Sequence, residues 1–303
     1  MNQARPILAA TDFSPAARHA ADRAARLAHT TGSPLTLVHV LPGGGLHDLR
    51  QWLGGASEAE QQLHADAARQ LRQLADQLEA RRHVAVRSVN ASGAATEEIV
   101  READSLDAAL LVLGSRGLGF LRGLVLGTTS ERLLRRTSRP VLVVRQTPHE
   151  PYRRVLLALD FSAWSAPSLD VARWVAPHAH FVLLNVFQVP FEGKLRFAGV
   201  DADTIEFYRG QARAEATRQV HEFAAAAGFK SGHWQPCIVE GEAWMRIVEQ
   251  EQEQDCDLVV LGKHGRSVTE DLLLGSVTQI VLAEGSADVL VSTRAERGQA
   301  HPA

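Results

Sequence analysis

The 303-residue chain has the length of about two ordinary domains, and its 45% apolar and 22% charged residues are typical of a globular protein with two cores. The net charge of −3 is too small to indicate a nucleic-acid partner. The longest apolar run, residues 108–113, is far too short to span a bilayer. With no apolar signal segment near Arg5 and only two cysteines, Cys237 and Cys256, we expect a cytoplasmic protein without a membrane partner.

The first half of the chain alternates buried strands with helices. We expect strands over residues 5–11, 35–40, 84–89, 108–113 and 140–144. We expect helices over residues 14–32, 57–82, 94–103 and 127–136. In the first helix, Ser14 is placed as the N-cap, Pro15 as the first helical residue and Gly32 as the terminator.

Apolar stripes show which faces of these helices are buried. The stripe of the first helix consists of small residues, Ala17, Ala20, Ala21, Ala24 and Ala28. The stripe of the long second helix consists of Leu63, Ala67, Leu71, Leu74 and Leu78. Both stripes are expected to face the sheet.

The second half repeats the same plan after a short linker at residues 149–151. Strands are expected over residues 154–159, 181–187, 233–239, 258–261 and 289–292, with helices ending near 176 and spanning 203–227 and 242–252. Pro167 would remove an interior hydrogen bond from a helix that began at Ser162, so the first of these helices should begin near Ser165. The stripe of the 203–227 helix is Ala216, Val220, Phe223 and Ala227.

The repeat has a fixed offset of 148 positions. That offset separates Asp12 from Asp160, Gly114 from Gly262, and Gly127 from Gly275. We infer two tandem α/β domains over residues 1–147 and 151–294, each a doubly wound five-stranded parallel sheet with helices on both faces. Residues 1–147 carry 18 basic and 14 acidic side chains and residues 148–303 carry 14 and 21, so the first domain offers an anion the more favourable field.

A glycine loop follows the fourth strand of each half. The first begins at Gly114 and Gly117 and ends at Gly127-Thr128, and the second begins at Gly262 and Gly265 and ends at Gly275-Ser276. Such loops let the backbone approach a phosphate, and the helix behind them directs N–H groups the same way. The alternative is a structural turn in which Thr128 or Ser276 caps the helix.

An aspartate ends the first strand of each half, beside the expected glycine loop. In a doubly wound sheet ligands bind where the winding reverses, so Asp12 should flank the Gly114 loop and Asp160 the Gly262 loop. There a carboxylate can accept hydrogen bonds from a ribose. Capping of the following turn is an equally good explanation of Asp12 and Asp160.

The G-x2-G-x9-G-[S/T] pattern, with Asp12 after the first strand and Val40 at the end of the second, resembles the universal stress protein family. The resemblance covers nearly the whole chain as two tandem domains. It implies an adenine nucleotide alpha hydrolase-like fold and a domain pair formed through the last strands, residues 141–144 against 289–291, as a pseudo-dimer within one chain. It leaves open whether chains pair further as homodimers.

By this resemblance each domain binds ATP, AMP or ADP, with Mg²⁺ as an optional companion of the nucleotide. The matching residues in the first domain are Asp12 for the ribose, the Val40 backbone for adenine, and Gly114, Gly117, Gly127 and Thr128 for the phosphates. The matching residues in the second domain are Asp160, Val186, Gly262, Gly265, Gly275 and Ser276.

Charged residues within the loops distinguish the two expected sites. The first loop carries Arg116 and Arg122, whereas the second carries Lys263 and Arg266 together with Glu270 and Asp271. Arg116 and Lys263 are candidates for phosphate contact. Because acidic groups repel a triphosphate, we predict tighter nucleotide binding in the first domain.

Other chemistry has weaker support in the sequence. His233 and Cys237 lie about 13 Å apart along a strand, too far for one zinc ion, so we expect no metal site. Trp164, Trp174, Trp234 and Trp244 are expected to serve packing. We find no placed nucleophile, no His–carboxylate base and no Walker lysine, so a catalytic centre is not expected.

Three functions follow, in order of preference. The first is a stress-response sensor or regulator that binds an adenine nucleotide and hydrolyses it slowly at most, because cradling phosphates stabilises ground and transition states alike. The second is a scaffold that acts through protein contacts without nucleotide. The third, a nucleotide-activating synthetase, is disfavoured because no length remains for a second substrate domain.

Overall fold

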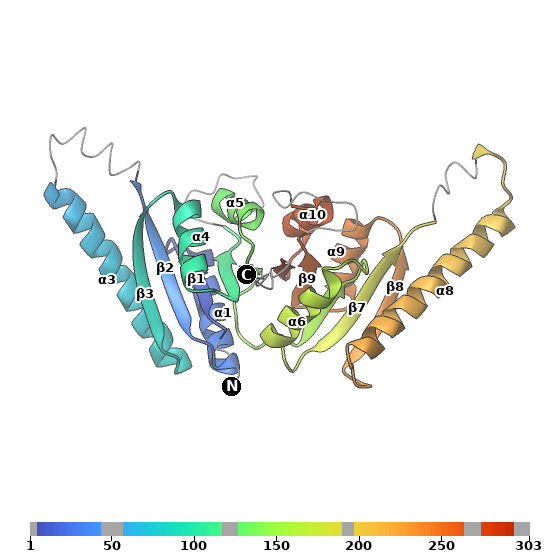
Figure 1. Ribbon diagram of the computed structural model, residues 1–303, viewed down its shortest axis with the longest axis horizontal. Coiled ribbons are helices and arrows are strands. Elements are labelled where there is room, and N and C mark those ends of the chain that lie inside the picture. The colour runs from blue at the N-terminus through green and yellow to red at the C-terminus, as the bar shows by residue number, and fades with distance from the viewer. Residues whose placement is uncertain (1–4, 44–56, 117–126, 190–196, 264–273, 294–303) are drawn as a thin grey trace, which may run out of the picture. The chain divides into compact units, whose positions relative to one another are not determined.

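A computed structural model of the protein describes residues 5–43, 57–116, 127–189, 197–263 and 274–293. These residues form two compact units, one from residue 5 to Pro151 together with Thr293, and the other from Tyr152 to Ser292. Each unit is a parallel sheet with helices on both of its faces (Figure 1). The expected fold class of two tandem doubly wound domains is confirmed. The pairing of residues 141–144 with 289–291 stays a prediction.

The first unit is organised around five parallel strands in the order β3-β2-β1-β4-β5. The strands are β1 (Ile7–Ala10), β2 (Leu35–Pro42), β3 (Val86–Gly93), β4 (Leu110–Gly114) and β5 (Val141–Val144). The helices are α1 (Pro15–Thr31), α3 (Ser57–Arg82), α4 (Ala95–Ser105) and α5 (Thr128–Arg136). The chain winds outward from β1 to β3 and then returns to add β4 on the other side of β1, so the winding reverses between β1 and β4.

The second unit repeats this arrangement in the order β8-β7-β6-β9-β10. The strands are β6 (Arg154–Ala158), β7 (His180–Phe187), β8 (Trp234–Glu240), β9 (Leu258–Gly262) and β10 (Asp288–Ser292). The helices are α6 (Ser165–Val175), α8 (Ala202–Ala226), α9 (Ala243–Glu253) and α10 (Ser276–Glu284). Here the winding reverses between β6 and β9, at the position that matches β1 and β4.

Small residues bring α1 close to its sheet. The Ser14 hydroxyl accepts a hydrogen bond from the Ala17 N–H at 3.2 Å, Pro15 begins the helix, and Gly32 ends it in the left-handed conformation at φ 65°, as expected. The alanine stripe of α1 is fully buried. Because alanine side chains are short, α1 packs directly on β1 and β4, and this places its first turn beside the carboxyl end of β4.

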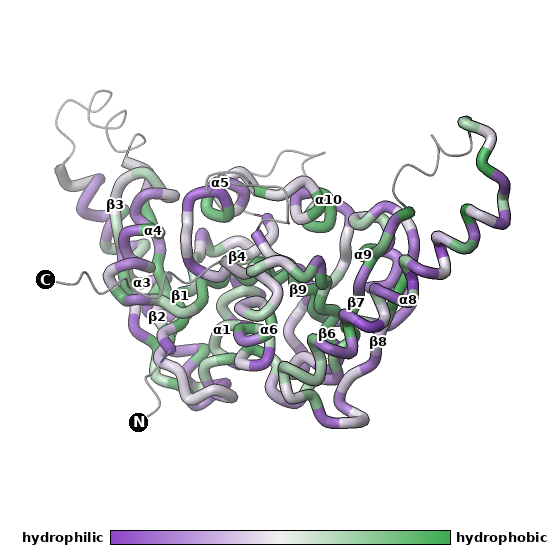
Figure 2. Tube along the Cα trace, turned by 45° about the vertical axis from the view of Figure 1, so that its right-hand side comes forward, coloured by the Kyte–Doolittle hydropathy of each residue, from purple (hydrophilic) through white to green (hydrophobic). Residues whose placement is uncertain are grey.

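The long helices α3 and α8 depart from the expected stripes at particular residues. In α3 the stripe from Ala67 to Leu78 is buried, but Leu63 is 44% exposed, so the buried part of the expected stripe begins at Ala67. In α8, Ala224 is buried in place of Phe223, and Ala227 caps the helix end. Hydrophilic and hydrophobic residues alternate along α8 (Figure 2), as expected of a helix that covers only one edge of a sheet.

Candidate functional site

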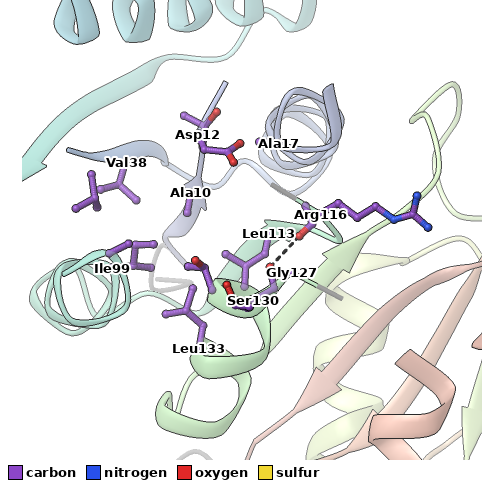
Figure 3. Close-up of a pocket in the computed structure, with 16 residues that line it drawn as sticks. Ala10, Asp12, Ala17, Val38, Ile99, Leu113, Arg116, Gly127, Ser130 and Leu133 are labelled. Carbon is purple, nitrogen blue, oxygen red and sulfur yellow. Dashed lines mark hydrogen bonds between the residues drawn. The ribbon is translucent and has the colours of Figure 1, made fainter. Parts of the chain in front are cut away.

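A cavity of about 210 Å³ lies at the carboxyl ends of β1 and β4, where the winding of the first unit reverses. Strand ends, the first turn of α5 and one side of α4 enclose it (Figure 3). Its lining residues are Ala10, Thr11, Asp12, Ala17, Val38, Val40, Ala95, Ile99, Leu113, Gly114, Arg116, Gly127, Thr128, Thr129, Ser130 and Leu133. The expected crevice therefore exists and gathers the described candidate residues of the first domain, while Gly117 lies outside the described residues.

Asp12 lines the cavity and also holds the turn between β1 and α1. Its Oδ1 accepts the Ser14 N–H at 3.0 Å, and the preceding Thr11 hydroxyl accepts the Phe13 N–H at 3.0 Å. Phe13 adopts a positive φ of 64°, a conformation that a bulky residue rarely takes without such support. The turn-capping explanation of Asp12 is thus realised. It leaves the carboxylate on the cavity wall, so capping and ligand contact are compatible.

The end of β2 forms the opposite wall. Val40 lies on the cavity as expected, and its neighbour His39 donates from Nδ1 to the Thr11 carbonyl oxygen at 2.8 Å. The His39 ring also packs against the Phe13 ring with centroids 4.4 Å apart. These contacts fix the Thr11–Phe13 turn relative to β2, so the two walls of the cavity are held in one arrangement.

Gly114 is required for a reason other than phosphate approach. A Cβ atom built there would lie 2.8 Å from the Ala16 carbonyl carbon and 2.9 Å from the Ala17 nitrogen. The missing side chain therefore admits the first turn of α1 against the end of β4. Gly114 still lines the cavity, but its clearest physical task is to let a helix and a strand pack closely.

The start of α5 is anchored to β4 and open toward the cavity. The Gly127 N–H donates to the Ser115 carbonyl oxygen at 2.9 Å, and the Ser130 hydroxyl donates to the Gly114 carbonyl oxygen at 2.9 Å (Figure 3). The N-cap residue is Gly127 itself, with no side-chain cap, so Thr128 is the first helical residue instead of the cap. This end of α5 therefore presents backbone N–H groups and a positive dipole end to the cavity.

Arg116 is at the edge of the cavity. Its side chain is exposed, and in Figure 3 its guanidinium extends away from the other labelled residues. The described cavity wall thus carries Asp12 and hydroxyl groups around the helix start, while the Arg116 cation extends away from its edge (Figure 3).

The second unit contains a matching cavity, also of about 210 Å³, at the carboxyl ends of β6 and β9. Its lining residues are Ala158, Leu159, Asp160, Trp164, Ser165, Ser168, Leu184, Val186, Ala243, Ile247, Leu261, Gly262, Gly275, Ser276, Val277 and Thr278. The described candidates of the second domain are brought together here, apart from Lys263, which is buried and does not line the cavity. Gly265 lies outside the described residues.

The hydrogen bonds around this second cavity reproduce those of the first. Asp160 Oδ1 accepts the Ser162 N–H at 2.9 Å, and Phe161 has a positive φ of 57°. Asn185 stands in for His39, since its Nδ2 donates to the Leu159 carbonyl oxygen at 2.8 Å. The helix start is anchored likewise: the Thr278 hydroxyl donates to the Gly262 carbonyl oxygen at 3.0 Å. The same cavity is therefore built twice with partly different residues.

The two cavities differ most clearly at the first turn of α6, the helix that follows the Asp160 turn. As expected from Pro167, α6 begins at Ser165, two residues later than a helix capped by Ser162 would. The longer turn places Trp164 among the residues that line the cavity. Ser165 donates its hydroxyl to Asp160 Oδ1 at 3.3 Å, a contact for which Ala17 in the first unit has no group.

Several site residues escaped the sequence interpretation. They are Ala95, Ile99 and Ser130 in the first unit and Ala243, Ile247 and Thr278 in the second. Each pair shares the 148-residue offset, so a comparison of the two halves position by position would have found them. Within the described residues no group of three or more potential ligands could hold a metal ion, and no helix is both long and apolar enough to pass through a membrane.

The fold and the duplicated cavity define a tandem α/β protein with a ligand-sized hollow at each point where the winding reverses. The universal stress protein family model matches residues 3–145 and again residues 151–293. The chain therefore belongs to the universal stress protein family.

Two relatives and one solved structure match the full tandem length of this chain. A universal stress protein of Mycolicibacterium smegmatis is 28% identical over 306 residues, covering 94% of this chain and 96% of that protein. One from Mycobacterium tuberculosis is 26% identical over 301 residues, covering 96% of this chain and 97% of that protein. The crystal structure of a universal stress protein from Archaeoglobus fulgidus DSM 4304 has the same fold, with a TM-score of 0.69 at 19% identity, covering 96% and 99% of the two chains.

Proposed function

We propose that each domain binds an adenine nucleotide in its cavity and that the protein acts as a nucleotide-dependent sensor or regulator in the stress response. The observation that carries the proposal is the repeated combination of a strand-end carboxylate, a backbone wall and an uncapped helix start around one cavity. The hydroxyl groups of a ribose can donate hydrogen bonds to the carboxylate, and phosphates can accept hydrogen bonds from the N–H groups at the helix N-terminus. A cytoplasmic location belongs to the same proposal.

The cavities favour binding over catalysis. Among their described lining residues there is no histidine, lysine or cysteine that could serve as a base or a nucleophile. We therefore expect hydrolysis to be slow at most. A bound Mg²⁺ would be held mainly by the phosphates of the nucleotide.

A thermal-unfolding comparison of ATP, GTP and buffer tests the proposal. Ligand at a hundredfold its dissociation constant stabilises a folded protein by about 2.7 kcal/mol, so ATP should raise the melting temperature more than GTP does. The absence of a shift with every nucleotide would overturn the proposal and favour a scaffold that acts through protein contacts.

Two matched variants test whether the nucleotide binds in these two cavities. Ala10 and Ala158 occupy equivalent positions on the walls of the two cavities, so Ala10→Leu and Ala158→Leu should each fill one cavity. Each variant should lower the number of nucleotides bound per chain from two to one in isothermal titration. Ala65→Leu, on the exposed face of α3, is the control and should leave both sites intact.

A further inference from the structure

The cavity of the second domain has an aromatic wall that the first domain lacks. Trp164 lines it and is half-buried, whereas the residue 148 positions earlier is Ala16, whose side chain is not on the first cavity wall. A partly exposed indole can stack against a flat ring and gain contact area from it. Trp164 therefore borders the space that a ligand in the second cavity would occupy.

Hydrogen bonds hold the turn that carries Trp164. Asp160 Oδ1 accepts from the Ser162 N–H at 2.9 Å and from the Ser165 hydroxyl at 3.3 Å, which ties both ends of the turn to one carboxylate. The Ser162 hydroxyl in turn accepts the Trp164 N–H at 3.4 Å. Because α6 begins only at Ser165, these hydrogen bonds hold the backbone of Trp164 at the N-cap of the helix.

The helix start of the second domain is less suited to phosphates. Val277 lines this cavity where Thr129 lines the first, so one hydroxyl is replaced by an apolar group. No cationic side chain lines the second cavity within the described residues. A ligand in this cavity gains more from an aromatic contact than from charge.

We propose that Trp164 determines the specificity of the second site by stacking on the base of a nucleoside. The second domain then takes nucleosides and nucleotides with few phosphates, whereas the first domain depends on the phosphates of its ligand. This inference rests on the proposed nucleotide-binding function. It adds a division of ligand class between the two domains of one chain.

The test uses the full chain carrying Ala10→Leu, in which only the second cavity is open. Isothermal titration with adenosine, AMP and ATP should give dissociation constants within about threefold of one another. Base–aromatic stacking is worth about 1–3 kcal/mol, so adding Trp164→Leu should weaken adenosine binding by about tenfold or more. Trp164→Phe retains a ring and should retain most of the affinity, and ligand-free melting curves verify that both variants fold.

Three results would count against the inference. If Trp164→Leu changes adenosine binding by less than twofold, the indole is not part of the site. If ATP binds the Ala10→Leu chain tenfold or more tightly than adenosine, phosphates dominate the second site as well. If neither the Ala10→Leu nor the Ala158→Leu chain binds any of these ligands, the proposed function itself fails, which distinguishes that outcome from the first two.

Discussion

At the scale of single residues, Gly114 shows how one missing side chain can serve packing and a site together. The backbone of Ala16 and Ala17 occupies the space that a Cβ would need, so the glycine allows α1 to approach β4. Because α1 begins beside the cavity, that close approach also positions Asp12 and its turn. The sequence pattern singled out Gly114 as a phosphate-binding candidate, which stays a prediction, while the neighbour that makes glycine necessary belongs to another element.

Gly114→Ala should destabilise the first domain by about 1–3 kcal/mol, because backbone atoms at 2.8–2.9 Å must move to admit the methyl group. Gly210→Ala is the matched control. Gly210 lies within α8 with nothing within 4 Å of a built Cβ, so alanine there should stabilise the helix by about 1 kcal/mol. Urea denaturation measures both changes. An unchanged midpoint for Gly114→Ala would contradict the packing role.

Cys256 predicts a pH dependence of stability. Burial raises the pKa of its thiol from about 9 to about 12. The unfolded chain therefore releases this proton near pH 9 while the folded chain keeps it, so the stabilising contribution is complete below pH 9 and is lost as the pH rises toward 12. In Cys256→Ala the free energy of unfolding should fall less steeply between pH 9 and 12 than in the parent chain. Equal slopes would show that the thiol is accessible and titrates normally in the folded state.

At the scale of elements, helix contacts explain where the sequence patterns succeeded and failed. Capping residues are local signals, and Ser14, Pro15 and Gly32 fixed the ends of α1 correctly. Burial is not local, because it depends on how far the sheet extends beneath a helix. Leu63 satisfies the apolar spacing of α3 yet is exposed, since the stripe continues past the part of the helix that the core covers.

The ion pair between α3 and α1 is partly buried and has two contacts. Arg82 donates from Nε to Asp22 Oδ1 at 2.9 Å and from an Nη to Oδ2 at 2.7 Å, and this hydrogen bonding raises the pKa of Arg82 above its usual value. A double-mutant cycle with Arg82→Gln and Asp22→Asn should give a coupling energy of about 1 kcal/mol.

The pair formed by Arg139 and Asp107 is the comparison for that cycle. The Asp107 side chain is 90% exposed, whereas those of Arg82 and Asp22 are 24% and 20% exposed. Solvent screening should reduce the Arg139–Asp107 coupling to a few tenths of a kcal/mol. Couplings of equal size in the two cycles would show that burial does not strengthen the Arg82–Asp22 pair.

At the scale of the whole molecule, the duplication allowed the fold to be predicted from a single sequence. The 148-residue offset aligned two copies of the same strand and loop pattern, and both copies fold into the same strand order. The position of the cavity followed, because the place where the winding reverses depends on topology. The sequence did not predict how the residues that line the second cavity differ from those that line the first. Trp164 lines the second cavity just before α6 begins at Ser165, whereas Ala16 at the equivalent position does not line the first cavity.

The two cavities should differ in how they discriminate among ligands. Titration of the Ala10→Leu and Ala158→Leu chains with ATP should show the tighter binding in the chain that retains the first site, because the first domain carries the more basic sequence and the more polar helix start. The difference in ATP affinity between the two sites should become smaller with added salt, because salt screens the charges. Tighter ATP binding by the second site would contradict this ranking.

We expect a nucleotide to bind between the carboxyl ends of β1 and β4, and again between those of β6 and β9. Electron density from crystals grown with ATP would test this binding at both places. The density should show a base near Val40, a ribose at Asp12 and phosphates at the backbone of Gly127 and Thr128, with a related ligand in the second cavity. Density for the nucleotide elsewhere, or cavities filled by rearranged side chains at saturating ATP, would contradict this expectation.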